Sequence, residues 1–153
     1  MQLTRQTDYA MRAVLYLATS PLASIKEIAE AQSVPQEYLA KILQKLARAG
    51  IVTTHRGVGG GVSLARVPEK ISMLDVIEAI EGNVALNRCF IKPSECPRES
   101  FCAMHDELDR IGSSLAAMFG KVNFARLARD EAARTGSNSA RVSGNSARTG
   151  AKF

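Results

Sequence analysis

The stretch EYLAKILQKLARAGIVTTHRGVGGGVSLAR, residues 37–66, decides the fold of this 153-residue chain. Its first half predicts a helix that reaches about Ala49 and stops at Gly50, because its leucines and isoleucine recur at helical spacing. The residues that this helix buries are Leu39, Ile42, Leu43 and Leu46. Its second half has two short strand-forming runs around a glycine-rich tip, which is typical of a β-hairpin. A helix followed by a hairpin of this kind indicates a recognition helix and a wing.

Two further helices precede this stretch. An amphipathic pattern predicts the first over residues 3–19, which Pro21 stops. Ser24, with Glu27 three residues later, forms a capping box that opens a second helix over 26–32. A turn at 33–35 then leads into the recognition helix. The order helix, short helix, turn, helix and two-stranded wing predicts a winged helix-turn-helix.

The second half of the chain predicts more helices and a tail. Ser72 caps a helix over 73–81, and a longer helix begins near Ser100 after a polar loop. This longer helix carries apolar residues at alternating spacings of three and four, which one helix cannot bury alone. We therefore expect it to pair with a second copy of the chain, the alternative being packing within its own domain. The seam consists of Leu108, Ile111, Leu115, Met118 or Phe119, and Val122.

These elements divide the chain into three parts. Residues 1–82 form the predicted DNA-binding domain, and 83–133 form a cysteine loop with the dimerisation helix and a last short helix from 123 to about 134. Residues 134–153 are rich in Gly, Ser, Asn and Arg, so they predict a disordered basic tail. The fold class is mainly α with a small β-wing.

Charge is unevenly distributed along the chain. Residues 1–66 hold eight Lys/Arg and four Asp/Glu, a net charge of +4, whereas 67–133 hold eight and eleven, a net charge of −3. A basic front favours a polyanionic partner, although an ordinary surface can show the same asymmetry. No run reaches the roughly 18 apolar residues of a membrane span, and no secretory signal is visible. We therefore expect a cytoplasmic protein that does not enter the membrane.

Polar residues on the recognition helix and the wing are the expected contacts to double-stranded DNA. Gln36 lies near the end of the helix that enters the major groove, and Arg56 is the best candidate for phosphate or minor-groove contact at the wing. The full set is Gln36, Tyr38, Lys41, Lys45, Arg48, Arg56, Gly57 and Gly59. The glycine-rich tip joins two strands, whereas a nucleotide-binding loop joins a strand to a helix, so an enzyme of that kind is disfavoured.

The three cysteines of the chain, Cys89, Cys96 and Cys102, lie within fourteen residues of one another, and His105 follows. An odd number of thiols on a polar loop indicates a metal or iron–sulfur site rather than a disulfide framework. Tetrahedral zinc also accepts three cysteines and one histidine, so a zinc or thiol/disulfide switch is the alternative. A catalytic thiol is disfavoured, because only His55 and His105 are available as bases.

Three segments and the cysteine loop together resemble the IscR/NsrR/RirA-type iron–sulfur transcription regulators. The segments are MQLTRQTDYAMRAVLYLA (1–18), residues 37–66, and ISMLDVIEAIEG (71–82). The resemblance covers residues 1 to about 130. It implies a homodimeric repressor of winged-helix subunits, whose cluster alters operator affinity in response to nitric oxide, redox state or iron.

The resemblance also implies the ligands of the cluster. Cys89, Cys96 and Cys102 match the cysteine ligands. His105 matches the fourth ligand of the members that hold a [2Fe-2S] centre, and Asp8 matches the aspartate that a partner subunit donates to a [4Fe-4S] centre. Both residues are present, so the fourth ligand stays open. Ala40 stands where the cluster-assembly repressors carry an acidic base-reading residue, and this favours the nitric-oxide or iron-responsive branch.

Overall fold

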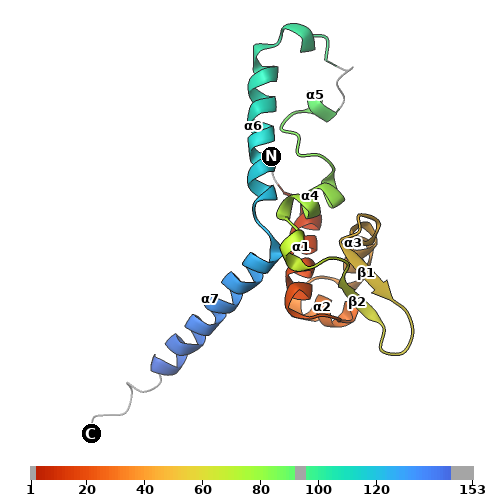
Figure 1. The fold of residues 1–153 in the computed structure, drawn as a ribbon, viewed down its shortest axis with the longest axis vertical. Helices are drawn as coiled ribbons and strands as arrows, with labels where there is room; N and C mark the ends of the chain where they lie inside the picture. The colour runs from red at the N-terminus through yellow and green to blue at the C-terminus, as the bar shows by residue number, and fades with distance from the viewer. Residues whose placement is uncertain (1–2, 92–95, 146–153) are drawn as a thin grey trace.

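A three-helix head with a β-hairpin lies at one side of the molecule, between two long helices that extend from it in different directions (Figure 1). The computed structural model describes residues 3–91 and 96–145. In the head, α1 (Arg5–Thr19), α2 (Ile25–Gln32) and α3 (Gln36–Arg48) precede β1 (Val52–His55) and β2 (Gly61–Leu64). After a 3-10 turn at Pro68–Lys70, α4 (Met73–Glu81) packs on α1 and α3. The predicted fold class, mainly α with a small β-wing, is confirmed.

The second half of the chain projects away from the head (Figure 1). It contains the short α5 (Arg88–Ile91), a 3-10 turn at Glu99–Phe101, the long α6 (Ala103–Gly120) and α7 (Phe124–Asn145). The long helix thus begins three residues later than Ser100, because the 3-10 turn occupies the residues before it. Its last predicted seam residue, Val122, lies beyond the end of the helix.

Local capping explains where several helices begin and end. In the capping box of α2, the Glu27 backbone N–H donates to Ser24 Oγ at 3.2 Å, and the Ser24 N–H donates to Glu27 Oε2 at 2.6 Å. Hydrogen bonds that the Glu27 carboxylate accepts from the backbone N–H and then from the hydroxyl of Ser24 lower the pKa of Glu27. Ser72 and Asp75 form a second such box at α4. Gly50 follows α3 with a φ of 68°, as its predicted stop requires.

The core lies where α1, α2, α3 and the base of the hairpin meet. The apolar face predicted for α3 is confirmed, since all four of its apolar residues are buried. The fully buried residues of the core include Val14, Ile28, Leu39, Ile42, Leu46, Ile51 and Val62. The recognition helix is therefore held mainly by its inward apolar face, and its outer face includes the exposed residues Gln36, Lys41 and Arg48.

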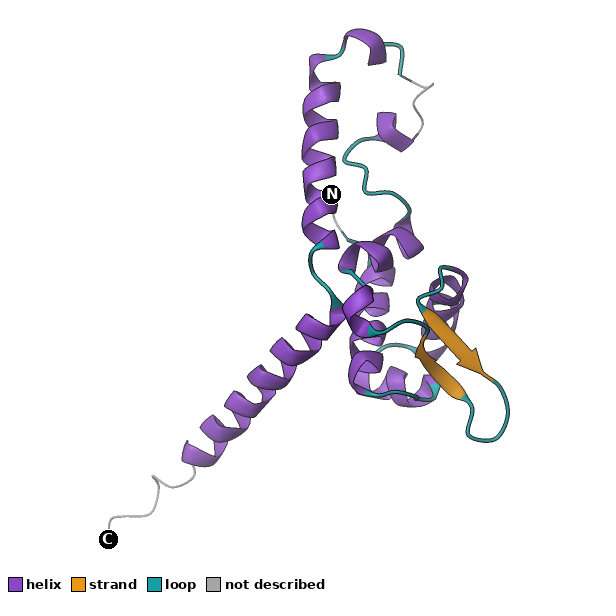
Figure 2. Cartoon of the chain, viewed as in Figure 1, coloured by secondary structure: helices purple, strands orange, loops and turns teal. Residues whose placement is uncertain are grey.

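Backbone hydrogen bonds help to anchor the hairpin to the head. β1 and β2 pair antiparallel, from Val52 opposite Leu64 to His55 opposite Gly61. Ala23 and Val62 exchange backbone hydrogen bonds of 3.1 and 2.8 Å, which bind the first half of β2 to the segment before α2. The tip, residues 56–60, projects beyond this anchor as a wing (Figure 2).

The start of α7 returns to the head and completes its core, which the division at residue 82 did not anticipate. Phe124 is buried to 1% exposure and is among the largest fully buried side chains. Its backbone N–H donates to the Ile71 carbonyl at 3.0 Å, and the Met73 N–H donates to the Val122 carbonyl at 2.8 Å. The head therefore consists of residues before 82 together with the first turns of α7.

α7 continues to Asn145, so the prediction that this helix ends near Arg134 is wrong, whereas the disorder predicted for the tail stays a prediction. No proline lies between residues 124 and 145, so the backbone hydrogen bonds of the helix are not interrupted. Thr135 Oγ1 bonds to the Glu131 and Ala132 carbonyls without leaving the helix. The rest of the predicted tail, 146–153, lies outside the described residues.

Candidate nucleic-acid interface and cysteine site

The outer face of α3 carries most of the predicted DNA contacts. Gln36, Tyr38, Lys41 and Arg48 are exposed, while the opposite face is buried. Gln36 is the first residue of the helix, and Lys41 lies about one turn beyond it. The amide of Gln36 and the hydroxyl of Tyr38 can read base edges, and the cations can bind phosphates. This face can therefore bind a DNA groove.

Lys45, which was predicted as a phosphate contact, does not belong to this exposed face of α3. Its side chain is half-buried, and its Nζ donates to Gln6 Oε1 of α1 at 2.8 Å and to the Ile80 carbonyl of α4 at 3.5 Å. Because the ammonium is turned toward these two helices, Lys45 joins α3 to α1 and α4 in this structure.

The wing presents Arg56 at its exposed tip. Gly57 and Gly59 have φ values of 100° and 76°, so the turn needs residues without a side chain, as the sequence indicated. Gly60 is constrained by space instead: a Cβ there would lie 2.4 Å from the His55 carbonyl oxygen. His55 Nε2 and Ser63 Oγ form a 2.8 Å hydrogen bond across the strands. The backbone conformation of this glycine turn therefore fixes the position of the Arg56 backbone at the tip.

A hollow of 460 Å³ separates the first turns of α1 and α3, and sequence reasoning missed its α1 side. Tyr9 and Tyr38 pack edge to face across it, with ring centres 5.9 Å apart and planes at 87°. Arg5 is exposed at its rim, beside Lys41. Arg5 and Tyr9 lie one turn apart on α1, and this spacing was the signal that could have found them.

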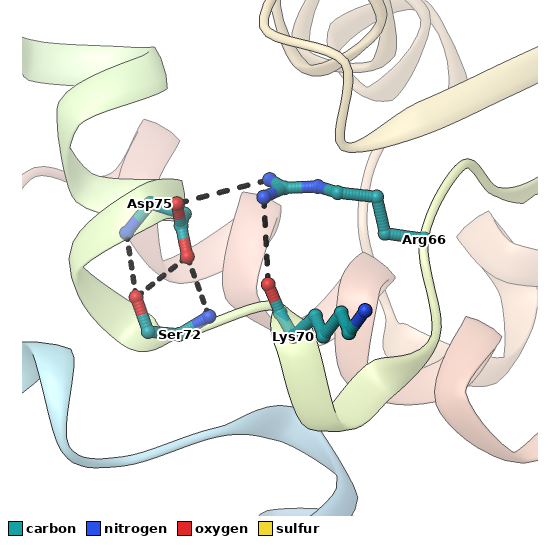
Figure 3. Close-up of polar contacts among 4 residues, drawn as sticks. All are labelled: Arg66, Lys70, Ser72 and Asp75. Atoms are coloured by element: carbon teal, nitrogen blue, oxygen red, sulfur yellow. Dashed lines mark hydrogen bonds and ion pairs between the residues drawn. The ribbon is translucent and has the colours of Figure 1, made fainter.

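The base of the wing is tied to the start of α4 by Arg66 (Figure 3). Its guanidinium lies 3.7 Å from Asp75 Oδ1 and donates to the Lys70 carbonyl at 3.4 Å. Asp75 also accepts hydrogen bonds from the backbone N–H and the hydroxyl of Ser72, at 2.7 and 2.6 Å. The wing and α4 are thus joined by polar contacts at the surface.

The three cysteines occupy the region between the head and α6. Cys89 lies in α5 and Cys102 is the N-cap of α6; all three thiols are partly exposed and free of disulfides. In residues 3–91 and 96–145, no three His, Cys, Asp or Glu side chains gather closely enough to hold a metal ion. The structure therefore does not bring the predicted ligands together within this chain.

The two candidate fourth ligands lie in different places. The ring of His105 packs against that of Phe90, the residue after Cys89, with ring centres 4.7 Å apart. The backbone N–H of His105 donates to the Cys102 carbonyl at 2.9 Å. This contact joins the α5 side of the loop to the start of α6. Asp8 lies on α1, where its carboxylate pairs with Arg12 at 2.8 Å, and both side chains are about half exposed.

The donor chemistry of this region fits an iron–sulfur cluster. Three free, partly exposed thiols within one loop are the ligands that such clusters use, and imidazole or carboxylate can complete the set.

No helix in the described part of the chain is long and apolar enough to cross a membrane.

Residues 3–130 match the Rrf2 family, described as iron-dependent transcriptional regulators. The chain is 41% identical over 111 residues to protein aau3 of Rhizobium meliloti, a match that covers 71% of this chain and 72% of that protein. It is 30% identical over 135 residues to the transcriptional regulator NsrR of Bacillus subtilis, covering 86% and 92%. The NsrR of Shouchella clausii is 39% identical over 93 residues, covering 59% of this chain and 62% of that protein, which is less than two thirds of its length.

Solved structures agree with this assignment. T. potens IscR superimposes with a TM-score of 0.69 at 25% identity, covering 86% of this chain and 88% of that one. The oxidized form of Staphylococcus aureus CymR gives a TM-score of 0.64 at 25% identity, covering 84% and 96%. The chain therefore belongs to the Rrf2 family of DNA-binding transcriptional regulators, and it is not an enzyme.

Proposed function

We propose that this chain is a cytoplasmic, homodimeric repressor whose operator affinity depends on an iron–sulfur cluster held by Cys89, Cys96 and Cys102. The observation that carries this proposal is the position of three free thiols between the DNA-reading head and α6. A cluster bound there would respond to nitric oxide, oxygen or iron shortage. The iron-dependent description of the family and the similarity to NsrR proteins support the same function.

The head supplies the operator contacts in this proposal. The exposed residues of α3 lie in the major groove, and Arg56 contacts phosphates or the minor groove beside it. The dimer forms along α6, where Ile111 is 48% and Met118 is 65% exposed. Two such apolar residues on one helix need a partner surface, and a second copy of α6 supplies it.

The fourth ligand is either His105 or Asp8. His105 favours a site within one subunit, because its contact with Phe90 places it beside the residue that follows Cys89. Asp8 would instead come from the partner subunit, and it would have to leave its pair with Arg12. Both side chains are chemically suitable, and neither would supply the fourth thiolate that an all-cysteine site has.

Anaerobic purification tests the cluster directly. We expect a brown protein with iron and acid-labile sulfide, and operator affinity that changes when nitric oxide or oxygen is added. The Cys96→Ala variant should lose the iron and sulfide but remain a folded dimer. The His105→Ala and Asp8→Asn variants should separate the two candidate ligands, since only loss of the true ligand changes the visible spectrum. A colourless protein, or affinity that does not respond to cluster loss, contradicts the proposal.

A zinc or thiol switch at the same cysteines is the second candidate. The observation in its favour is that all three thiols are free and partly exposed, and that a protein similar to this chain, Staphylococcus aureus CymR, is known in an oxidized form. Stoichiometric zinc in a colourless protein, or operator affinity that changes with disulfide formation in iron-free protein, would support this candidate over the cluster.

A further inference from the structure

The C-terminal end of α4 is bonded to both of the helices that position the DNA-reading face. Lys45 of α3 donates to Gln6 Oε1 at 2.8 Å and to the Ile80 carbonyl at 3.5 Å. Gln6 is the second residue of α1. One half-buried ammonium therefore connects three helices at a single point.

Glu81, the last residue of α4, makes the second connection. Its Oε1 accepts a hydrogen bond from the Thr4 backbone N–H at 2.9 Å, from Thr4 Oγ1 at 3.1 Å, and from Thr7 Oγ1. Thr7 is fully buried, and it is 74 residues away in sequence. A carboxylate that accepts three donors from the first turn of α1 holds that turn against the end of α4.

The segment that carries the cysteines begins immediately after these contacts. Gly82 ends α4 with a φ of 84°, and Cys89 follows seven residues later. At its other end, α4 is joined to the base of the wing through Asp75 and Arg66. The nine-residue helix α4 thus contacts the base of the wing at its first end. At its second end it contacts α1 and α3 and leads into the cysteine segment.

We infer that Lys45 and Glu81 are positioning residues, which transmit the state of the cysteine segment through the end of α4 to the recognition helix. This inference rests on the proposed function for the source of the signal. A displacement of Ile80 and Glu81 moves the acceptors of Lys45, Thr4 and Thr7, so α1 and α3 must follow or break these bonds. Lys45 acts through α3 and does not contact DNA.

The salt dependence of binding separates this role from a phosphate contact. Each phosphate contact that is lost lowers the slope of log K against log salt by about 0.9. Lys45→Met keeps most of the apolar stem but removes the ammonium, so it should weaken binding without changing the slope. Lys41→Met is the matched control on the exposed face of the same helix, and it should lower the slope by about 0.9 per subunit.

The coupling is tested by measuring operator affinity for cluster-loaded and cluster-free protein. For wild type we expect the two affinities to differ by about 5- to 150-fold. Lys45→Met and Glu81→Ala should bring this ratio at least fivefold closer to one, with iron content and dimer formation unchanged. Glu81→Gln, which keeps an acceptor oxygen, should retain more of the ratio than Glu81→Ala. Glu78→Gln removes the same charge from the exposed side of α4 and should leave the ratio unchanged.

The outcomes distinguish this inference from the proposed function. A wild-type ratio that is large and is preserved in both Lys45→Met and Glu81→Ala overturns the inference and leaves the proposed function standing. A slope for Lys45→Met that falls as it does for Lys41→Met overturns it as well. If the wild-type ratio is one, the proposed function fails, and the salt series on cluster-free protein still decides whether Lys45 positions α3. If Glu81→Ala does not fold, the Lys45→Met ratio decides alone.

Discussion

Replacing Gly60 by alanine should disrupt the wing tip without unfolding the head. Gly60 does not have a positive φ, so alanine is compatible with its backbone angles. The added Cβ, however, would lie 2.4 Å from the His55 carbonyl oxygen and 2.9 Å from the Gly57 carbonyl oxygen, whereas ordinary contact begins at 3.4 Å. Both neighbours are backbone atoms, so no side chain can turn away to make room.

The size of the effect follows from these distances. The turn must open by about 1 Å at His55, the difference between 3.4 and 2.4 Å. Overpacking of this kind costs roughly 1–3 kcal/mol, and the 3.0 Å bond from the Gly60 N–H to the Gly57 carbonyl is lost as well. Because the tip is exposed, the turn can relieve most of this cost locally. We expect a melting temperature within about 3 °C of wild type, given roughly 2–4 °C per kcal/mol for a chain of this size.

The loss should instead fall on DNA binding, because Arg56 is displaced with the tip. We expect operator affinity to fall about tenfold, or about 1.4 kcal/mol, in a fluorescence anisotropy titration at fixed salt. Val58→Ala, a change at the fully exposed tip, is the control and should bind as wild type does. In the double variant with Arg56→Ala, the two losses should not add, since both act through Arg56. Gly60→Ala binding within twofold of wild type would refute this reasoning.

Three further variants test the head. Thr7→Val removes a hydroxyl that donates to Glu81 from a fully buried site, so it should cost about 1–2 kcal/mol in denaturant unfolding; an unchanged midpoint would contradict the contact. Burial acts to raise the pKa of Glu81, but the bonds from Thr7 and Thr4 outweigh it and leave the pKa below 4.5. The resulting stabilisation is present above that value and is lost as the pH falls through the lower folded-state pKa, so the stability difference between wild type and Glu81→Gln should shrink as the pH falls below 4.5. Phe124→Ala should cost roughly 3–5 kcal/mol in thermal unfolding of the head, and a small effect would show that α7 is dispensable to the core.

Local signals account for what could be predicted from the sequence. Ser24 with Glu27, Ser72 at the start of α4, and Gly50 and Gly82 at helix ends each act through backbone groups within four residues. The same holds for the buried face of α3, whose period depends only on helix geometry. These features place the recognition helix and the wing (Figure 2). They also place the exposed cations Lys41, Arg48 and Arg56 on these elements.

Contacts between distant segments could not be predicted in this way. The direction of Lys45 depends on Gln6 and Ile80, which lie 39 and 35 residues away, and no period in α3 encodes them. The return of Phe124 to the core depends on where α6 ends, and the sequence of α7 alone reads as an ordinary amphipathic helix. The predicted ligands Cys89, Cys96, Cys102 and His105 were placed in one loop by their spacing, but spacing does not fix the distances between the side chains.

The partial burial of the cysteine segment bears on how the proposed cofactor would act there. In the described part of this segment, Leu86 lies beside Gly112 and Phe90 packs against His105, and none of the described side chains between residues 83 and 91 is fully buried. A segment with so little buried apolar surface gains little folding free energy of its own, so ligand bonds from the three cysteines would supply much of its order. Loss of those bonds would then change the segment far more than the head, whose core is complete without it. The end of α4 is where that change would reach the head, because Ile80 and Glu81 hold α1 and α3 there.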